Sequence, residues 1–361
     1  MEIQLATASI NNVDQNTQKE ADIPGENENK NDELVIDIRE MFKRPKIRSS
    51  TQCHIYKVLH YLRKWNEEAY TPQVISIGPF HHKNERLKAM EEHKEIYFRN
   101  FVERSEIKLE YLVDTIREME KIIRGCYAET IGGCLTSDDP MAGEPRADAV
   151  MLYLLLLENQ FPFFVIEKLY FNMQFIEASP NVKIEHFTDL LRTFQIPPPC
   201  KRPYRGYRMI DLLFTATQHH DAGVKFEWCF ESFDSDIKFE KRVLKIPSLE
   251  LSDPMEVVYR NIIALEQTRY IKEGYFTDYF IFMDLLIKTK KDADLLCDKN
   301  ILFNCLDDSY AVEFMIKNLN KGIFLINMRN DYVDVSKKLK SFYEQRPWQR
   351  RIYGTIKKRI F

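Results

Sequence analysis

The chain has 361 residues, of which 44% are hydrophobic and 30% charged, a balance typical of globular proteins with a sizeable core. Its net charge of −3 is unevenly spread: the last 27 residues, 335–361, hold nine Lys or Arg and one acid, a charge of +8 that leaves −11 for the rest. An acidic body argues against general nucleic-acid binding. Seven scattered cysteines without a CxxC pair favour reduced thiols over a disulfide framework.

Three regions are predicted from composition. Residues 1–33 are rich in Asn, Gln and Glu and poor in apolar side chains, and LVIDIREMF after them has helical spacing; residues 1–50 are expected to form a disordered segment and linker. Residues 51–345 are expected to form one large domain, and residues 346–361 a basic C-terminal tail.

The first ordered elements are predicted to be helical. A helix is expected to begin near Cys53, because Ile55, Val58, Leu59 and Leu62 would share one of its faces. Two further helices are expected between Leu87 and Arg124. The second has an apolar stripe typical of a core or helix-pairing surface, formed by Leu109, Val113, Ile116, Met119 and Ile123.

The run LYLLLLENQFPFF, residues 152–164, combines leucines with three polar side chains. Its apolar part is shorter than the roughly 20 residues that cross a bilayer, so it predicts a core helix with a break or kink at Pro162. An unpaired buried polar group costs about 1–3 kcal/mol. Glu158, Asn159 and Gln160 are therefore expected to hydrogen-bond to another part of the fold.

Apolar and polar residues alternate from Val224 to Phe230, and Leu244 to Leu251 have a similar pattern, which predicts a small antiparallel β element around residues 223–251. Asp253 is the expected N-cap of a helix with Pro254 at N1. Further helices are predicted over residues 275–289 and 309–319. The expected fold is mainly α (α+β), a helix-rich single large domain.

A second polar group, Glu266 and Gln267, ends the segment RNIIALEQ. We expect a buried network that fixes the register of neighbouring helices, with Arg260 as the charge partner of one of its acids. A functional polar site between helices is the alternative. The predicted members are Glu158, Asn159, Gln160, Arg260, Asn261, Glu266 and Gln267.

Histidines raise the question of an enzyme. His81 and His82 are adjacent, and His93 follows two glutamates, but no HExxH, GxSxG or phosphate-binding loop accompanies them. Adjacent histidines rarely share a metal. We therefore expect no catalytic, metal, cofactor or small-molecule site. A hydrolase or metal-dependent enzyme using the His81, His82 and His93 region is the alternative.

The basic tail is the clearest candidate surface. In a helix, its isoleucines 352, 356 and 360 would share one stripe opposite basic residues. Such a helix can bind an anionic membrane with about 1 kcal/mol per Lys or Arg, and a frayed end is the alternative. The candidate membrane or partner residues are Arg350, Arg351, Lys357, Lys358 and Arg359.

Several motifs resemble those of the plant domain-of-unknown-function 247 proteins, also called UPF0481. The match spans residues 53–348 and keeps the family's order. It rests on CHIYKVLHYLRKWNEEAYTPQVISIGPFHH, MEEHK, LLLLENQFPFFVIEKL, DAGVKF, IPSLEL and YRNIIALEQ.

Two departures from that family stand out. The segment before the leucine run is shorter than usual, and RRIYGTIKKRIF follows Arg346-Pro347-Trp348 where the family commonly has a membrane-spanning helix. The resemblance implies a non-enzymatic protein–protein interaction module in recognition or signalling, with an unidentified protein partner. It also implies membrane association at the plasma membrane or its cytoplasmic face, or a cytoplasmic location if the C-terminal helix is missing.

Overall fold

The computed structural model describes residues 54–105, 108–129, 147–171, 183–198, 210, 214–229, 237–324 and 328–345. The chain divides into two units, Met1–Arg48 and Ser49–Phe361, and every element below belongs to the second. The predicted disordered segment 1–50 and the basic tail 346–361 lie outside the described residues.

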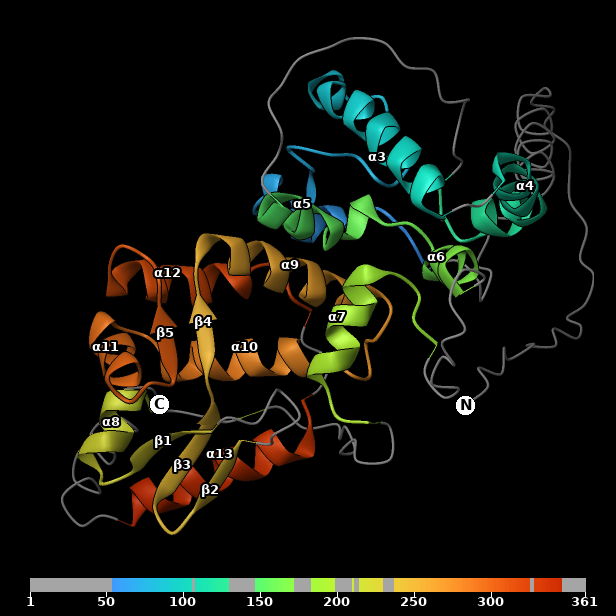
Figure 1. Cartoon of the computed structure of the whole chain (residues 1–361). Helices are drawn as coiled ribbons and strands as arrows, with labels where there is room; N and C mark the ends of the chain where they lie inside the picture. Colours follow the sequence, from blue (N-terminus) through green and yellow to red (C-terminus); the bar gives the residue numbers. More distant parts are fainter. Residues whose placement is uncertain are drawn as a thin grey trace, which may run out of the picture. The chain divides into compact units, whose positions relative to one another are not determined.

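Helices dominate the first half of this unit (Figure 1). The two helices predicted between Leu87 and Arg124 are confirmed. The elements, with η for a 3-10 helix, are α2 (His60–Arg63), η1 (Glu68–Tyr70), η2 (Glu85–Leu87), α3 (Ala89–Ser105), α4 (Leu109–Gly125), α5 (Ala147–Leu154), η3 (Leu157–Asn159), α6 (Phe163–Phe171), α7 (Phe187–Gln195) and α8 (Ala216–Asp221).

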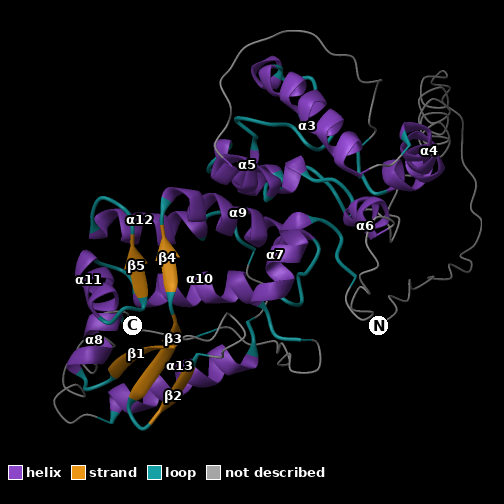
Figure 2. Ribbon diagram, viewed as in Figure 1, coloured by secondary structure: helices purple, strands orange, loops and turns teal. Residues whose placement is uncertain are grey.

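The second half mixes short strands with helices (Figure 2). The helix-rich fold with a small β element is confirmed. The elements are β1 (Lys225–Cys229), β2 (Lys238–Glu240), β3 (Val243–Pro247), β4 (Leu249–Leu251), α9 (Asp253–Thr268), α10 (Tyr275–Leu286), α11 (Lys290–Asp298), β5 (Leu302–Asn304), α12 (Ser309–Leu319) and α13 (Asn330–Glu344).

The strand directions are mixed, so the prediction of an all-antiparallel element was wrong. In the three-stranded sheet β1-β3-β2, β3 runs antiparallel to β2 but parallel to β1. Lys241 and Arg242 both have positive φ, the conformation of the tight two-residue turns that join hairpin strands such as β2 and β3. A separate parallel pair joins β4, at the end of the predicted range 223–251, to β5, which lies beyond it, and α9–α11 form the crossover between them.

The main core lies between these strands and α9–α13. Alternate residues of β3 and β4 are buried against it, and the aromatic side chains of α10, including Phe276, Phe280 and Phe282, fill its centre. Helices α9 and α10 lie side by side with β4 next to them (Figure 1). Because both faces of α9 are covered, most of its residues from Val258 to Glu266 are buried, including polar ones.

Several predicted helix boundaries differ from the structure, and the helix expected over residues 275–289 ends at Leu286. Near the start, only α2 is helical, because the N–H of Ile55 donates to Cys126 O and its carbonyl accepts from Ala128 N, both at 2.9 Å, in a parallel bridge. Backbone groups used by another segment cannot form helical bonds. Helix α9 begins one residue early: Ser252 is its N-cap, and Asp253 is its first residue.

The apolar stripe of α4 is only partly a packing surface. Met119 is buried, and Ile123 packs partly buried beside the Ile55 bridge. Leu109, Val113 and Ile116 are exposed. Helix α4 contacts α6 along the buried side of the stripe.

Candidate functional site

The predicted helix from the leucine run ends early, at Leu154, and Glu158 lies in the short turn η3 that follows. The Glu158 carboxylate is buried. Its Oε1 accepts from Val58 N at 2.9 Å and from Arg63 Nη1 at 2.6 Å, and its Oε2 lies 3.1 Å from His81 Nε2. Burial raises the pKa of this carboxyl, but the hydrogen bonds from His81 and Val58 and the charge of Arg63 outweigh it and lower the pKa.

Asn159 fixes the segment Ile75–Gly78 against the turn. Its Oδ1 accepts from Ile77 N at 2.6 Å and Gly78 N at 3.2 Å. Its Nδ2 donates to Ile75 O at 2.9 Å and to Tyr153 O, at the end of α5, at 3.1 Å. One buried amide thereby uses all of its donors and acceptors on backbone groups.

Gln160 joins the end of one helix to the start of another. Its Nε2 donates to the carbonyls of Leu154 and Leu156, at 2.7 and 2.6 Å, which a continuing helix would have used itself. Its Oε1 accepts from Phe187 N at 2.9 Å and Thr188 N at 3.4 Å, the first two N–H groups of α7. The early end of α5 therefore follows from these side-chain caps, ahead of Pro162.

Asn261 connects this turn to α9. Its Oδ1 accepts from Leu157 N, while its Nδ2 donates to Ala69 O in η1 and to Val257 O, all at 2.8 Å. The structure thus brings Glu158, Asn159, Gln160 and Asn261 together in one buried joint. We call these four residues the polar joint.

Glu266 organises a second buried cluster. Its carboxylate accepts from the N–H groups of Tyr275, Phe276 and Thr277, which open α10, at 2.9 to 3.3 Å. A carboxylate at a helix N-terminus satisfies orphan donors and the positive end of the helix dipole. Arg192 Nε from α7 lies 3.2 Å from its Oε1, and the same guanidinium stacks 4.0 Å from the Tyr270 ring.

Two members of the predicted network lie elsewhere. The expected pairing of Arg260 with an acid of that network was wrong: its ion pair is to Glu256, one turn earlier on α9, at 2.8 Å. Gln267 is only partly buried, and its Oε1 accepts from Phe324 N at 3.0 Å. The basic partner of Glu266 is Arg192, which was not predicted from the sequence. Helix α7 around it has apolar spacing that could have indicated a helix, but no local signal identifies an ion-pair partner 74 residues away.

Two histidines of the enzyme hypothesis, His81 and His93, have separate contacts. His81 binds Glu158, while the ring of His93 is tilted against that of Tyr97 at 6.4 Å, one turn later on α3. Within the residues that the structure describes, no group of three His, Cys, Asp or Glu side chains is placed to hold a metal ion.

Other buried histidines were not predicted as site residues. His186 is the N-cap of α7, and its Nδ1 accepts from Asp189 N. Burial, and next the neighbouring His54, lower its pKa to about 3. His219 is buried edge-on to Phe214 and Tyr343, and burial lowers its pKa to about 4. Both imidazoles are therefore neutral at ordinary pH.

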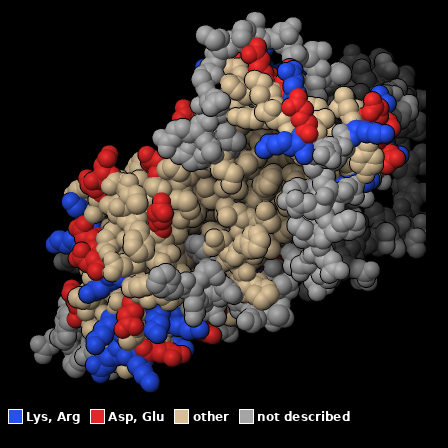
Figure 3. All heavy atoms as spheres, in the orientation of Figure 1, with Lys and Arg blue, Asp and Glu red and all other residues tan. Residues whose placement is uncertain are grey.

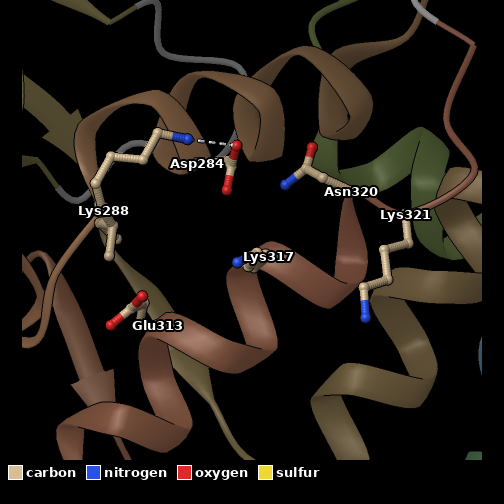
Figure 4. Close-up of a pocket in the computed structure, with 7 residues that line it drawn as sticks. Asp284, Lys288, Glu313, Lys317, Asn320 and Lys321 are labelled. Atoms are coloured by element: carbon tan, nitrogen blue, oxygen red, sulfur yellow. Dashed lines mark hydrogen bonds and ion pairs between the residues drawn. The ribbon is translucent and has the colours of Figure 1, made fainter.

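A pocket of about 330 Å³ opens between α10 and α12 (Figure 4). Asp284 and Lys288 reach it from the end of α10, with an ion pair between them at 2.8 Å, and Glu313 and Lys317 reach it from α12. The lining residues are Asp284, Ile287, Lys288, Glu313, Lys317, Asn320 and Lys321. None of the predicted site residues lines this pocket.

The predicted membrane or partner residues, Arg350, Arg351, Lys357, Lys358 and Arg359, lie outside the described residues. In the part that is described, no helix is both long and apolar enough to cross a membrane. On the face seen in Figure 3, Lys and Arg side chains are intermixed with Asp and Glu over β1–β3 and α13. The described residues there do not form a large field of one sign.

The geometry defines a helix-rich protein with small mixed sheets and a buried polar joint between sequence segments that lie far apart. A family model described as a plant protein of unknown function, DUF247, matches residues 55–141 and 136–361. The chain therefore belongs to the DUF247 family.

Two relatives come from Arabidopsis thaliana. The UPF0481 protein At3g47200 is 24% identical over 347 residues, covering 75% of this chain and 73% of the relative. The putative UPF0481 protein At3g02645 is 24% identical over 163 residues, covering 38% of this chain and 31% of the relative. No solved structure matches the chain.

Proposed function

We propose that the chain is a non-enzymatic protein–protein interaction module that acts in recognition or signalling. The observation that carries this proposal is that the polar groups of the polar joint are occupied by contacts within the fold. Glu158, Asn159, Gln160 and Asn261 bind backbone groups and ion-pair partners within the fold, so their role is to hold segments together.

The state of Glu158 supports binding over catalysis. A carboxyl that acts as a general acid near neutral pH needs a raised pKa, whereas that of Glu158 is lowered. His81, the nearest histidine, is already its partner at 3.1 Å.

The exposed side chains of the described residues also support a binding role. Trp65, Phe314 and Phe324 are 45%, 65% and 62% exposed. Aromatic residues are enriched at protein–protein interfaces and supply many of their energetic hot spots.

The test is affinity purification of the tagged full chain from plant tissue, followed by calorimetric titration with each purified candidate partner. We expect at least one purified protein to bind directly. A hydrolase panel run with wild type and His81→Ala tests the alternative. Turnover that is lost in His81→Ala, with no direct protein binder, would replace this proposal with the hydrolase.

Membrane attachment through the tail is a second proposal, supported by the +8 charge of residues 335–361. Attachment would place the protein at the cytoplasmic face of a membrane. In a liposome flotation assay, we expect the full chain to float only with anionic lipid and a chain ending at Trp348 to float less. Equal recovery with and without anionic lipid rules the tail out as an anchor.

A further inference from the structure

A cluster of exposed and partly exposed rings and lysines joins α2 to α12 and to the residues that follow it. We call it the aromatic–lysine surface, and its members are Tyr61, Lys64, Trp65, Phe314, Lys321 and Phe324. The rings of Tyr61 and Phe324 meet edge to face at 4.6 Å. The ammonium of Lys321 lies between two rings, 5.0 Å from the centroid of Trp65 and 5.9 Å from that of Phe314.

The backbone holds this surface in place. Gly322 has φ +80, and a Cβ there would lie 2.5 Å from Tyr61 O and 3.1 Å from Trp65 Nε1, so the two segments meet closely only because this residue is glycine. Gln267 accepts the N–H of Phe324 and fixes the backbone that carries this ring. The surface is therefore preorganised, which lowers the cost of binding.

Three lysines, two of this surface and one of the neighbouring pocket, lack acidic partners among the described residues. Lys64, Lys317 and Lys321 form no ion pair with any residue that the structure describes. Lys321 and Lys317 both line the pocket between α10 and α12, with Lys317 on α12 and Lys321 after the end of that helix (Figure 4). A pocket lined by two lysines that have no ion-pair partner among the described residues thus adjoins the aromatic–lysine surface.

We propose that the aromatic–lysine surface and this pocket bind an acidic peptide segment of a partner protein. A carboxylate of the peptide would lie between Lys317 and Lys321, where charge-assisted hydrogen bonds are available. An apolar side chain of the peptide would pack on Trp65 and Phe324. This inference rests on the proposed interaction function and gives it a surface and a partner chemistry.

A peptide fits these observations better than an anionic membrane. The pocket is concave, and its two carboxylates, Asp284 and Glu313, would repel a continuous layer of lipid phosphates.

The test is selection of a random peptide library on the immobilised full chain, with the affinity of each selected peptide measured by fluorescence anisotropy. We expect selected peptides to combine Asp or Glu with an aromatic or aliphatic residue. Lys317→Gln/Lys321→Gln and, separately, Trp65→Ala should each weaken binding about tenfold or more. Lys238→Gln/Lys245→Gln removes two exposed lysines from β2 and β3 and should leave the affinity unchanged.

Three results overturn the proposal: no enrichment of acidic peptides, equal binding to all variants, or flotation with phosphatidylserine vesicles that is lost in the Lys317→Gln/Lys321→Gln variant. A purified partner that binds wild type and all three variants equally would overturn this surface while leaving the interaction function standing. Thermal unfolding of each variant confirms that a lost affinity reflects the surface.

Discussion

The side chains of Arg192 and Glu266 form an ion pair at 3.2 Å although they are only 1% and 0% exposed. The same carboxylate caps α10, so α7, α9 and the start of α10 meet at one buried charge pair. Removing one partner from such a pair leaves an uncompensated charge inside the protein, which is more costly than the pair itself is stabilising.

Glu266→Gln should lower the free energy of unfolding by about 3–5 kcal/mol, because buried Arg192 would keep its charge with only the more distant carboxylate of Glu273, at 3.8 Å. Urea unfolding followed by circular dichroism measures the change. Glu67→Gln is the matched control: its carboxylate is 75% exposed and pairs with Arg63, so a loss below about 1 kcal/mol is expected. Similar losses in the two variants would contradict the structural role of Glu266.

Gln160→Leu keeps most of the side-chain volume but removes the hydrogen bonds to two backbone carbonyls near the end of α5 and to two backbone N–H groups at the start of α7. Each buried group left unpaired costs about 1–3 kcal/mol, so a loss above about 2 kcal/mol is expected in the same unfolding experiment. Gln267→Leu, which gives up one contact to an exposed backbone N–H, should cost less than about 1 kcal/mol. If Gln267→Leu proves the more harmful, the bridging role of Gln160 is wrong.

Gly78→Ala should destabilise the protein by more than about 1 kcal/mol, because a Cβ at this position would lie 2.5 Å from Gln160 O. Gly125→Ala is the control at the end of α4, where a Cβ meets nothing within 4 Å. Alanine there should stabilise by up to about 1 kcal/mol through its greater helix propensity. Differential scanning calorimetry of both variants checks the opposite signs.

His219 should make the protein less stable in acid. Its pKa is lowered from 6.5 to about 4 by burial, so the unfolded chain binds a proton more readily between these pH values. Stability from the neutral imidazole is therefore present above pH 6.5 and is lost as the pH falls.

The variant His219→Phe fits the edge-on contacts with Phe214 and Tyr343 and cannot be protonated. Between pH 7 and pH 5, wild type should lose about 2 kcal/mol more stability than this variant. Unfolding titrations at the two pH values measure the difference. Parallel losses would show that His219 does not control the acid sensitivity.

The sequence predicted helices best where the spacing of apolar residues and the capping residues indicate the same segment. The helix expected over residues 309–319 is α12, residue for residue, and the one containing RNIIALEQ is α9. By contrast, α11 and α13 were not predicted, because their polar residues weaken the apolar spacing. For α11 a signal was available: Thr289 and Asp292 form a capping box.

The polar residues at issue could be identified from sequence, but their partners could not. A Glu-Asn-Gln triplet beside leucines indicates a need for hydrogen bonds without indicating where they end. The partners of Glu158 are 77 to 100 residues away, and Asn261 binds Ala69 across 192 residues. Arg260 was the nearest basic candidate on the same helix, yet the tertiary fold supplied Arg192 to Glu266 and Arg63 to Glu158.

The polar joint has a consequence for how the family's sequences vary. Three of the motifs that carry the family resemblance touch one another through it: the segment around Gly78 binds Asn159, His81 binds Glu158, and Asn261 binds Leu157. A change in one motif alters the hydrogen-bond requirements of another. Across relatives as distant as 24% identity, these positions should therefore be retained or exchanged together, as one unit of covariation.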